Sequence, residues 1–333
     1  MKHFFKIFLM HVFIIMFSFG CTCIQKPSTS KSFIKAPSIK QAKRIVFLGD
    51  SITFQGDMLV NTELWLKKLY PNKVFEIINV GLPSETITGL SEAGHANGTF
   101  PRPYVHDRLI SVLDKTQPDL IIAMYGINCG IYQSFNDKKD KRFQQGYLAL
   151  NKAINERNIP AVYITPPMYD HQKGSIDALD YNDKVLGSFS NWLLQKRVDG
   201  WHVIDLYNEM NRQIITLRKD RPDYFYQHDG IHMVDDGYWL LTDLIMNYFE
   251  PEKIIMNQQS TLYISDSLSL AETLSKSPQK LLTLTNKKMQ LTRDAWLTYT
   301  GHTRPKLPVG LPMNQYKIEL KALEKQITKI LDK

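Results

Sequence analysis

Short apolar runs alternate with amphipathic stretches over the first 250 residues of the chain. Apolar runs of four to seven residues, bounded by glycine, asparagine or proline, are typical of strands buried on both faces of a sheet. They predict strands at residues 45–48, 74–80, 120–124, 161–164 and 201–204. Apolar residues at helical spacing predict helices at residues 58–69, 105–113, 143–156 and 181–196. The alternation predicts an α/β fold with a five-stranded parallel sheet and helices on both faces.

The pattern changes after about residue 250. Residues 251–278 are polar and rich in serine, which indicates a linker or an irregular excursion. Two amphipathic stretches follow, at residues 281–299 and 313–331, and they predict a helical hairpin within residues 279–333. Two helices bury too little apolar surface to be stable alone. We therefore expect the hairpin to pack on the domain at residues 43–250.

Residues 1–20 resemble a secretory signal peptide, because lysines are followed by an apolar run and then by small residues. Charged residues interrupt the run, so it is shorter than the roughly 20 apolar residues of a membrane-spanning helix. The sequence Ser-Phe-Gly-Cys that ends at Cys21 resembles a bacterial lipidation site, and residues 21–42 form a polar tether. These features predict an exported lipoprotein, periplasmic or associated with the outer membrane. The alternative is a secreted soluble protein in which Cys21 has no special role.

The composition narrows the class of protein further. With 43% hydrophobic and 22% charged residues, the 333-residue chain is typical of a globular protein and not of a disordered or fibrous one. The net charge is +8, and +6 without the two lysines of residues 1–20. Because the lysines are scattered, no nucleic-acid partner is predicted. Three cysteines give neither a disulfide framework nor the paired motif of a zinc site.

Polar residues and glycines follow several of the predicted strands. Ser51 follows the first strand, Gly81 the second and Asn128 the third, and Asp229 and His232 lie beyond the fifth. The carboxyl ends of parallel strands meet at one edge of a sheet, so these groups are expected to lie together. They comprise a hydroxyl, a backbone N–H, an amide and a carboxylate–imidazole pair, which is the set that acyl transfer needs. The spacing of three residues predicts that Asp229 and His232 share one face of a helical turn, with the imidazole between Asp229 and Ser51.

These blocks resemble those of the SGNH hydrolases, the GDSL-type esterases and lipases, and within them a bacterial secreted subgroup. The matching blocks occur in the family's order: GDSI at 49–52, Gly81, Asn128 after a glycine, and DGIH at 229–232. The resemblance covers residues 43–250 and implies a flavodoxin-like three-layer α/β/α fold with strand order 2-1-3-4-5 and no cofactor or metal. It implies Ser51 as nucleophile, Asp229 and His232 as the rest of the triad, and Ser51, Gly81 and Asn128 as oxyanion-hole donors.

The chain departs from the family at Cys129, where the family has an aspartate next to the oxyanion asparagine. This departure leaves open a catalytically impaired protein that binds glycan. A nucleotide-binding protein is a second alternative, but the segment GDSITFQGD contains only two glycines for a phosphate loop. His228, Asp229 and His232 could instead form a metal site, and His302 could reach the mouth of the site.

The interpretation that unites these observations is an exported, serine-dependent carboxylic ester hydrolase. Its predicted substrates are small-molecule or glycan esters with short acyl groups, acetyl above all. The only predicted contact with a membrane is the lipid anchor.

Overall fold

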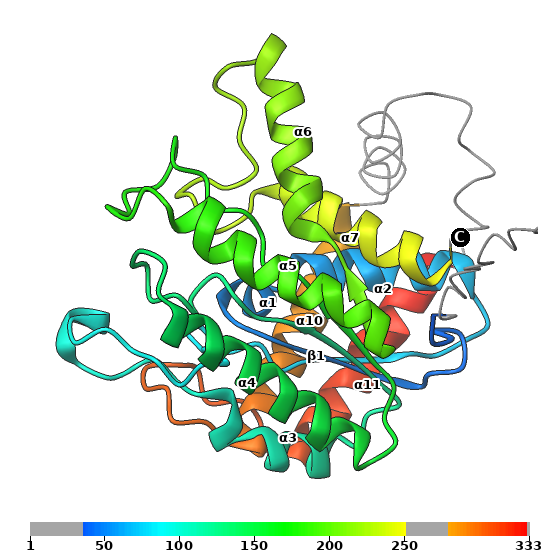
Figure 1. The fold of residues 1–333 in the computed structure, drawn as a ribbon. Helices are drawn as coiled ribbons and strands as arrows, with labels where there is room; N and C mark the ends of the chain where they lie inside the picture. The colour runs from blue at the N-terminus through cyan, green and yellow to red at the C-terminus, as the bar shows by residue number, and fades with distance from the viewer. Residues whose placement is uncertain (1–35, 251–278, 332–333) are drawn as a thin grey trace, which may run out of the picture. The chain divides into compact units, whose positions relative to one another are not determined.

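The computed structural model describes residues 36–250 and 279–331, which are drawn in colour in Figure 1. The predicted signal peptide, Cys21, the first part of the tether and the segment 251–278 lie outside the described residues. Within the described part of the chain, no helix has the length and apolar character needed to cross a bilayer.

Five parallel strands form one sheet in the order β2-β1-β3-β4-β5, which confirms the predicted topology. Each strand is a short apolar run whose side chains are almost all buried, as expected for a sheet covered on both faces. Residues of β1 pair with β2 on one side and with β3 on the other, so that Phe47 lies opposite both Asn79 and Ile122. The strand bounds are β1 Arg44–Gly49, β2 Glu76–Asn79, β3 Leu120–Met124, β4 Ala161–Ile164 and β5 His202–Ile204.

Two layers of helices cover the sheet. Helix α4 contacts α3 and α5 in one layer, and α7 contacts α2 and α6 in the other. The α-helices of this part of the chain are α1 Ser51–Gln55, α2 Asp57–Leu69, α3 Leu109–Thr116, α4 Asp137–Asn155, α5 Gly187–Gln195, α6 Leu206–Asp220 and α7 Asp235–Phe249. Short helical turns of other types are η1 His95–Gly98, η2 Val105–Asp107, η3 Tyr181–Leu186 and η4 Lys196–Asp199.

Several element bounds differ from the predicted ones. Strand β2 begins at Glu76 and not at residue 74, because Val74 lies on the surface and is 76% exposed. Helix α4 begins six residues earlier than predicted, where Asn136 caps it by accepting a hydrogen bond from the Lys138 N–H. Its first turns are charged and carry no apolar periodicity, so the apolar pattern alone could not detect them. Helices α6 and α7 were not predicted at all.

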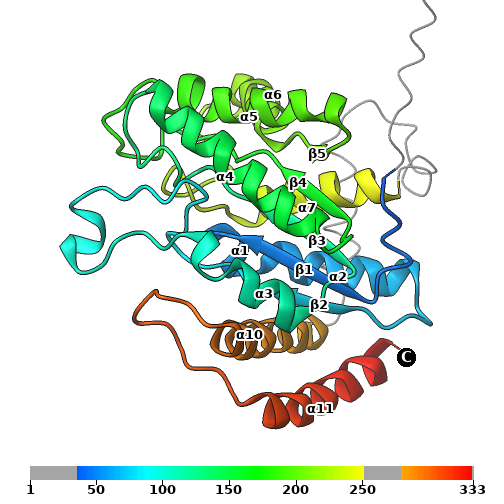
Figure 2. The ribbon, with the colours of Figure 1, turned by 60° about the horizontal axis from the view of Figure 1, so that its bottom comes forward.

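The C-terminal extension consists of α10 Gln279–Thr300 and α11 Met313–Leu331, which pack on each other. Helix α10 contacts α2 in one layer, α3 in the other and the edge strand β2 between them (Figure 2). The apolar side chains of α10 that were expected to face the domain, such as Leu281 and Trp296, are buried. Within the buried contact, Lys288 pairs with Glu63 of α2 at 2.7 Å and with Glu324 of α11.

Candidate active site

Ser51 is the first residue of α1, immediately after the carboxyl end of β1. The preceding Asp50 caps this short helix, because its Oδ1 accepts a hydrogen bond from the Ile52 N–H at 3.0 Å. Burial raises the pKa of Asp50 from 3.8 to about 7, although the Ile52 N–H opposes the rise. The strand and the cap together hold the Ser51 hydroxyl at the sheet edge where the predicted site residues meet.

Asp229 and His232 lie in a loop before α7, not on the helical turn that their spacing predicted. The prediction fails because Gly230 has a φ of 84°, which a helix cannot accommodate and which glycine adopts without strain. The loop instead folds around the Asp229 carboxylate. Its Oδ1 accepts the N–H groups of Ile231 and His232 at 2.9 and 2.7 Å.

The three side chains expected to act together do lie within hydrogen-bond distance. His232 Nδ1 is 2.7 Å from Asp229 Oδ2, and His232 Nε2 is 2.9 Å from Ser51 Oγ. Burial raises the pKa of Asp229, but the hydrogen bonds from the His232 ring and from two backbone N–H groups outweigh it and lower the pKa below its usual value. An ionised carboxylate only accepts hydrogen bonds, so Nδ1 carries the proton and Nε2 is left to accept the Ser51 hydroxyl proton.

Gly81 lies beside the Ser51 helix, as predicted, but its N–H already has an acceptor. It donates to Asn79 Oδ1 at 2.9 Å, and the Asn79 amide in turn donates to the Thr53 carbonyl at 2.8 Å. A side chain at position 81 would meet the Phe54 nitrogen at 2.4 Å, so glycine is required here by the close approach of α1. The Gly81 N–H could meet an oxyanion only by sharing or giving up its bond to Asn79.

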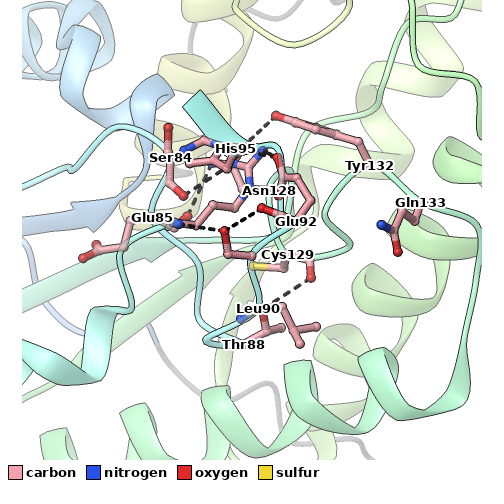
Figure 3. A network of polar contacts seen from close by, with 12 residues as sticks. Ser84, Glu85, Thr88, Leu90, Glu92, His95, Asn128, Cys129, Tyr132 and Gln133 are labelled. Atoms are coloured by element: carbon pink, nitrogen blue, oxygen red, sulfur yellow. Dashed lines mark hydrogen bonds and ion pairs between the residues drawn. The ribbon is translucent and has the colours of Figure 1, made fainter. Parts of the chain in front are cut away.

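The Asn128 side chain is buried and its orientation is fixed (Figure 3). Its Oδ1 accepts hydrogen bonds from Arg102 Nη1 at 3.1 Å and from the Tyr132 hydroxyl at 2.7 Å. A guanidinium has only hydrogens to offer, so the oxygen must face Arg102 and the NH₂ group must face away from it. Among the described residues, the acceptor for that NH₂ group is the Glu85 carbonyl, at a long 3.4 Å. The amide thus keeps donor capacity for a ligand.

Cys129 is fully buried and is not positioned as a second nucleophile. Its Sγ accepts the Ile87 N–H at 3.5 Å, and burial raises the pKa of the thiol from 9.0 to about 12. The structure holds the Asn128 side chain through other residues, Arg102 and Tyr132, neither of which the sequence analysis had singled out.

His302 does not join the Ser51 group but lies in a separate cavity of about 260 Å³ between α3 and the loop after α10. Glu85 and Arg108 also line this cavity and form a buried ion pair, with Arg108 Nη2 2.6 Å from Glu85 Oε2.

His228 lies beside the His232 ring, with 6.1 Å between the two ring centres. No three His, Cys, Asp or Glu side chains in residues 36–250 and 279–331 are grouped as metal ligands.

Comparison with known proteins identifies the family of this chain. Residues 47–240 match the sequence profile of the GDSL-like lipase/acylhydrolase family, which is more than half of the chain. The chain therefore belongs to this family and is a hydrolase of ester bonds. No curated protein sequence matches it.

Solved structures with this fold share little sequence with the chain. A gut microbial diltiazem-metabolizing enzyme is 18% identical with a TM-score of 0.50, over 65% of this chain and 48% of that one. The match thus spans about half of that enzyme's length. An acetyl xylan esterase from Geobacillus stearothermophilus is 15% identical with a TM-score of 0.49, over 64% and 96% of the two chains. A lipase/acylhydrolase from Enterococcus faecalis is 20% identical with a TM-score of 0.43, over 63% and 96%.

Proposed function

We propose that this protein is an exported serine esterase that removes short acyl groups from carbohydrate esters, with Ser51, His232 and Asp229 as its catalytic triad. The observation that carries the proposal is the continuous hydrogen-bonded series from Asp229 Oδ2 through the His232 ring to Ser51 Oγ. Family membership supports the reaction class, because the family hydrolyses esters.

The geometry accounts for each step of the proposed reaction. Ser51 Oγ attacks the ester carbonyl while its proton passes to His232 Nε2, and Asp229 stabilises the imidazolium that forms. The imidazolium then gives this proton to the oxygen of the leaving alcohol. In the second half, His232 takes a proton from water and the resulting hydroxide attacks the acyl-serine. The bond between the acyl carbon and Ser51 Oγ then breaks, the imidazolium returns its proton to Oγ, and the carboxylic acid leaves.

Negative charge develops on the carbonyl oxygen during both attacks. We assign its stabilisation to the Ser51 N–H and the Asn128 amide, with the Gly81 N–H contributing if it leaves Asn79. Loss of one such donor typically raises the barrier by about 3 kcal/mol. Asn128→Ala is therefore expected to lower kcat by at least a hundredfold.

The exposure of the triad favours an acyl group carried on a bulky alcohol. The side chains of His232 and Asp229 are 40% and 41% exposed, so the reacting hydroxyl lies at the surface and not at the bottom of a deep apolar tunnel. A short acyl substituent on a sugar can reach such a site, whereas a long acyl chain would gain little buried surface there.

Export and lipidation rest on the sequence of residues 1–21. Changing Cys21 to serine is expected to release the protein from the membrane fraction of cells that express the full chain. Unchanged fractionation would contradict lipidation at Cys21 while leaving the proposed chemistry untouched.

The decisive experiment compares wild-type protein with Ser51→Ala and His232→Ala on a panel of acetylated sugars and short p-nitrophenyl esters. We expect both variants to lose at least a thousandfold in kcat with unchanged melting temperatures, and EDTA to have no effect. A fluorophosphonate should label the wild type at Ser51. Absence of both hydrolysis and labelling would favour the glycan-binding alternative, and loss of activity with EDTA would favour a metal site.

A further inference from the structure

The side-chain oxygen of Asn128 accepts hydrogen bonds from two different side chains. Arg102 Nη1 and the Tyr132 hydroxyl both donate to Oδ1, at 3.1 and 2.7 Å. Asn128 and Tyr132 are labelled in Figure 3. Three hydrogen-bonding groups meet there with little access to water, since Arg102 is 7% and Asn128 is 3% exposed. In such surroundings hydrogen bonds are strong and polarise one another.

Arg102 is itself fixed on its other side. Its Nε and Nη2 donate to the two carboxylate oxygens of Glu92, each at 2.7 Å, in a bidentate ion pair. The guanidinium also lies 4.9 Å from the centre of the Tyr132 ring. Burial raises the pKa of Glu92, but the hydrogen bonds from Arg102 outweigh it and keep the pKa below its usual value. The guanidinium therefore cannot turn away from Asn128 without breaking a charged, two-point contact.

We propose that Arg102 and Tyr132 are positioning residues for catalysis, which fix the Asn128 NH₂ group toward the oxyanion and strengthen it as a donor. This inference rests on the proposed function, in which Asn128 stabilises the oxyanion. Donation to Oδ1 draws electron density from the amide nitrogen, so its N–H groups become better donors. The pair also supplies Asn128 with a support that does not depend on residue 129, where the family's aspartate is replaced by Cys129.

A purely structural role for the same contacts makes a different prediction. Arg102 and Glu92 join two parts of the long connection between β2 and α3, and a weakened connection would lower stability or substrate binding in general. A positioning role acts only in the transition state, so it lowers kcat and leaves KM unchanged. It also disappears when Asn128 is absent.

Tyr132→Phe is the cleanest test, because it removes one hydroxyl and keeps the ring that contacts Arg102 and Tyr181. Tyr163→Phe is the matched control. The Tyr163 hydroxyl donates to Asn151 Oδ1 at 2.9 Å, which is the same type of bond at a place between β4 and α4. Both variants should lose similar amounts of thermal stability. With p-nitrophenyl acetate, we expect Tyr132→Phe to lower kcat about tenfold with KM unchanged within twofold, and Tyr163→Phe to leave both constants unchanged.

Arg102→Lys adds a second, stronger perturbation. An ammonium keeps the charge but cannot bind both Glu92 oxygens and Asn128 at once, so we expect kcat to fall by about a hundredfold, close to the effect of Asn128→Ala. In the Asn128→Ala background, adding Tyr132→Phe should lower kcat by less than twofold, because the group it positions is gone.

The outcomes separate this inference from the function on which it rests. If the wild type shows no Ser51-dependent hydrolysis, the proposed function fails and the inference fails with it. If the wild type is active and folded Tyr132→Phe has the same kcat as Tyr163→Phe, only the inference is overturned. An equal loss from Tyr132→Phe with and without Asn128 would overturn it as well, by showing that the hydroxyl acts through another group.

Discussion

Replacing Lys288 with methionine tests how the C-terminal hairpin is held against the sheet domain. The Lys288 side chain is 5% exposed, and its ammonium lies 2.7 Å from Glu63 of α2 and also contacts Glu324 of α11. Burial alone would lower the pKa of Lys288, but these two carboxylates outweigh it and raise the pKa above its usual value. Methionine keeps an unbranched side chain of nearly the same length and removes the ammonium, with its charge and its hydrogen-bond donors.

The expected loss follows from the carboxylate left behind. Removing one partner of a buried ion pair typically costs about 3 to 5 kcal/mol, because the other charge stays buried. Lys67 remains 3.4 Å from Glu63, so the value should lie near the lower end, at about 3 kcal/mol. With an unfolding entropy of about 2.1 cal/mol/K per residue, that corresponds for a chain of this size to a melting temperature lower by about 4 to 5 °C.

Urea and thermal denaturation of Lys288→Met and of the control Lys325→Met, at an exposed lysine of α11, provide the measurement. Adding Glu63→Gln to Lys288→Met should recover part of the loss, since a neutral amide is less costly to bury than a charge. Surface substitutions usually change the free energy of unfolding by less than about 0.5 kcal/mol. If the free energy of unfolding of Lys288→Met lies within about that range of the wild-type value, the reasoning is refuted.

Three further predictions concern pH, residue 129 and the hairpin as a whole. The pKa of Asp50 is raised to about 7 in the folded protein, so between about pH 4 and 7 the folded state binds a proton that the unfolded state does not. The free energy of unfolding should therefore fall as the pH rises over this range, by at most about 1.4 kcal/mol per pH unit. Asp50→Asn, which can still cap α1, should remove this slope in urea denaturation at several pH values; an unchanged slope would exclude Asp50 as its source. Cys129→Asp should change kcat less than about threefold, because Arg102 and Tyr132 hold the Asn128 side chain. It should lower the melting temperature, because it buries a carboxylate. A tenfold gain in kcat would contradict this prediction. Truncation after Tyr248 should give an aggregating protein, because it uncovers the apolar surface that α10 buries, and a soluble truncate that melts like the full chain would refute this.

Much of the fold could be predicted because it depends on local pattern. Strand β3 is an apolar run buried along its whole length, and β1 is one from Ile45 onward; such runs are read directly from the sequence. Residues at the ends of these strands, Ser51 and Asn128, could then be placed at one sheet edge from the topology alone. The geometry at His232 could not be derived in this way, because it depends on the left-handed backbone of Gly230, which the spacing of polar residues does not reveal.

Two of the residues that sequence analysis missed, Arg102 and Lys288, make contacts between positions far apart in the sequence. Arg102 contacts a side chain 26 positions away, and Lys288 contacts one 225 positions away. No periodicity reports such a contact, because it depends on how loops and layers meet after the sheet has formed. In the sequence, Arg102 is distinguished only by its position between two prolines. That position indicates a constrained loop, but it does not show which side chain Arg102 contacts.

The position of α10 beside β2 has a consequence for how this protein meets other chains. An open parallel sheet ends in two strands whose outer N–H and C=O groups can pair with a foreign strand. Here β5 is only three residues long, and β2 is flanked by α10, which also contacts α2 and α3 on either side of it (Figure 2). Within the described residues, neither edge offers a long free template for strand addition. An esterase with the same sheet but without this hairpin would have to protect β2 by other means, such as a charged or bulged edge or a partner subunit.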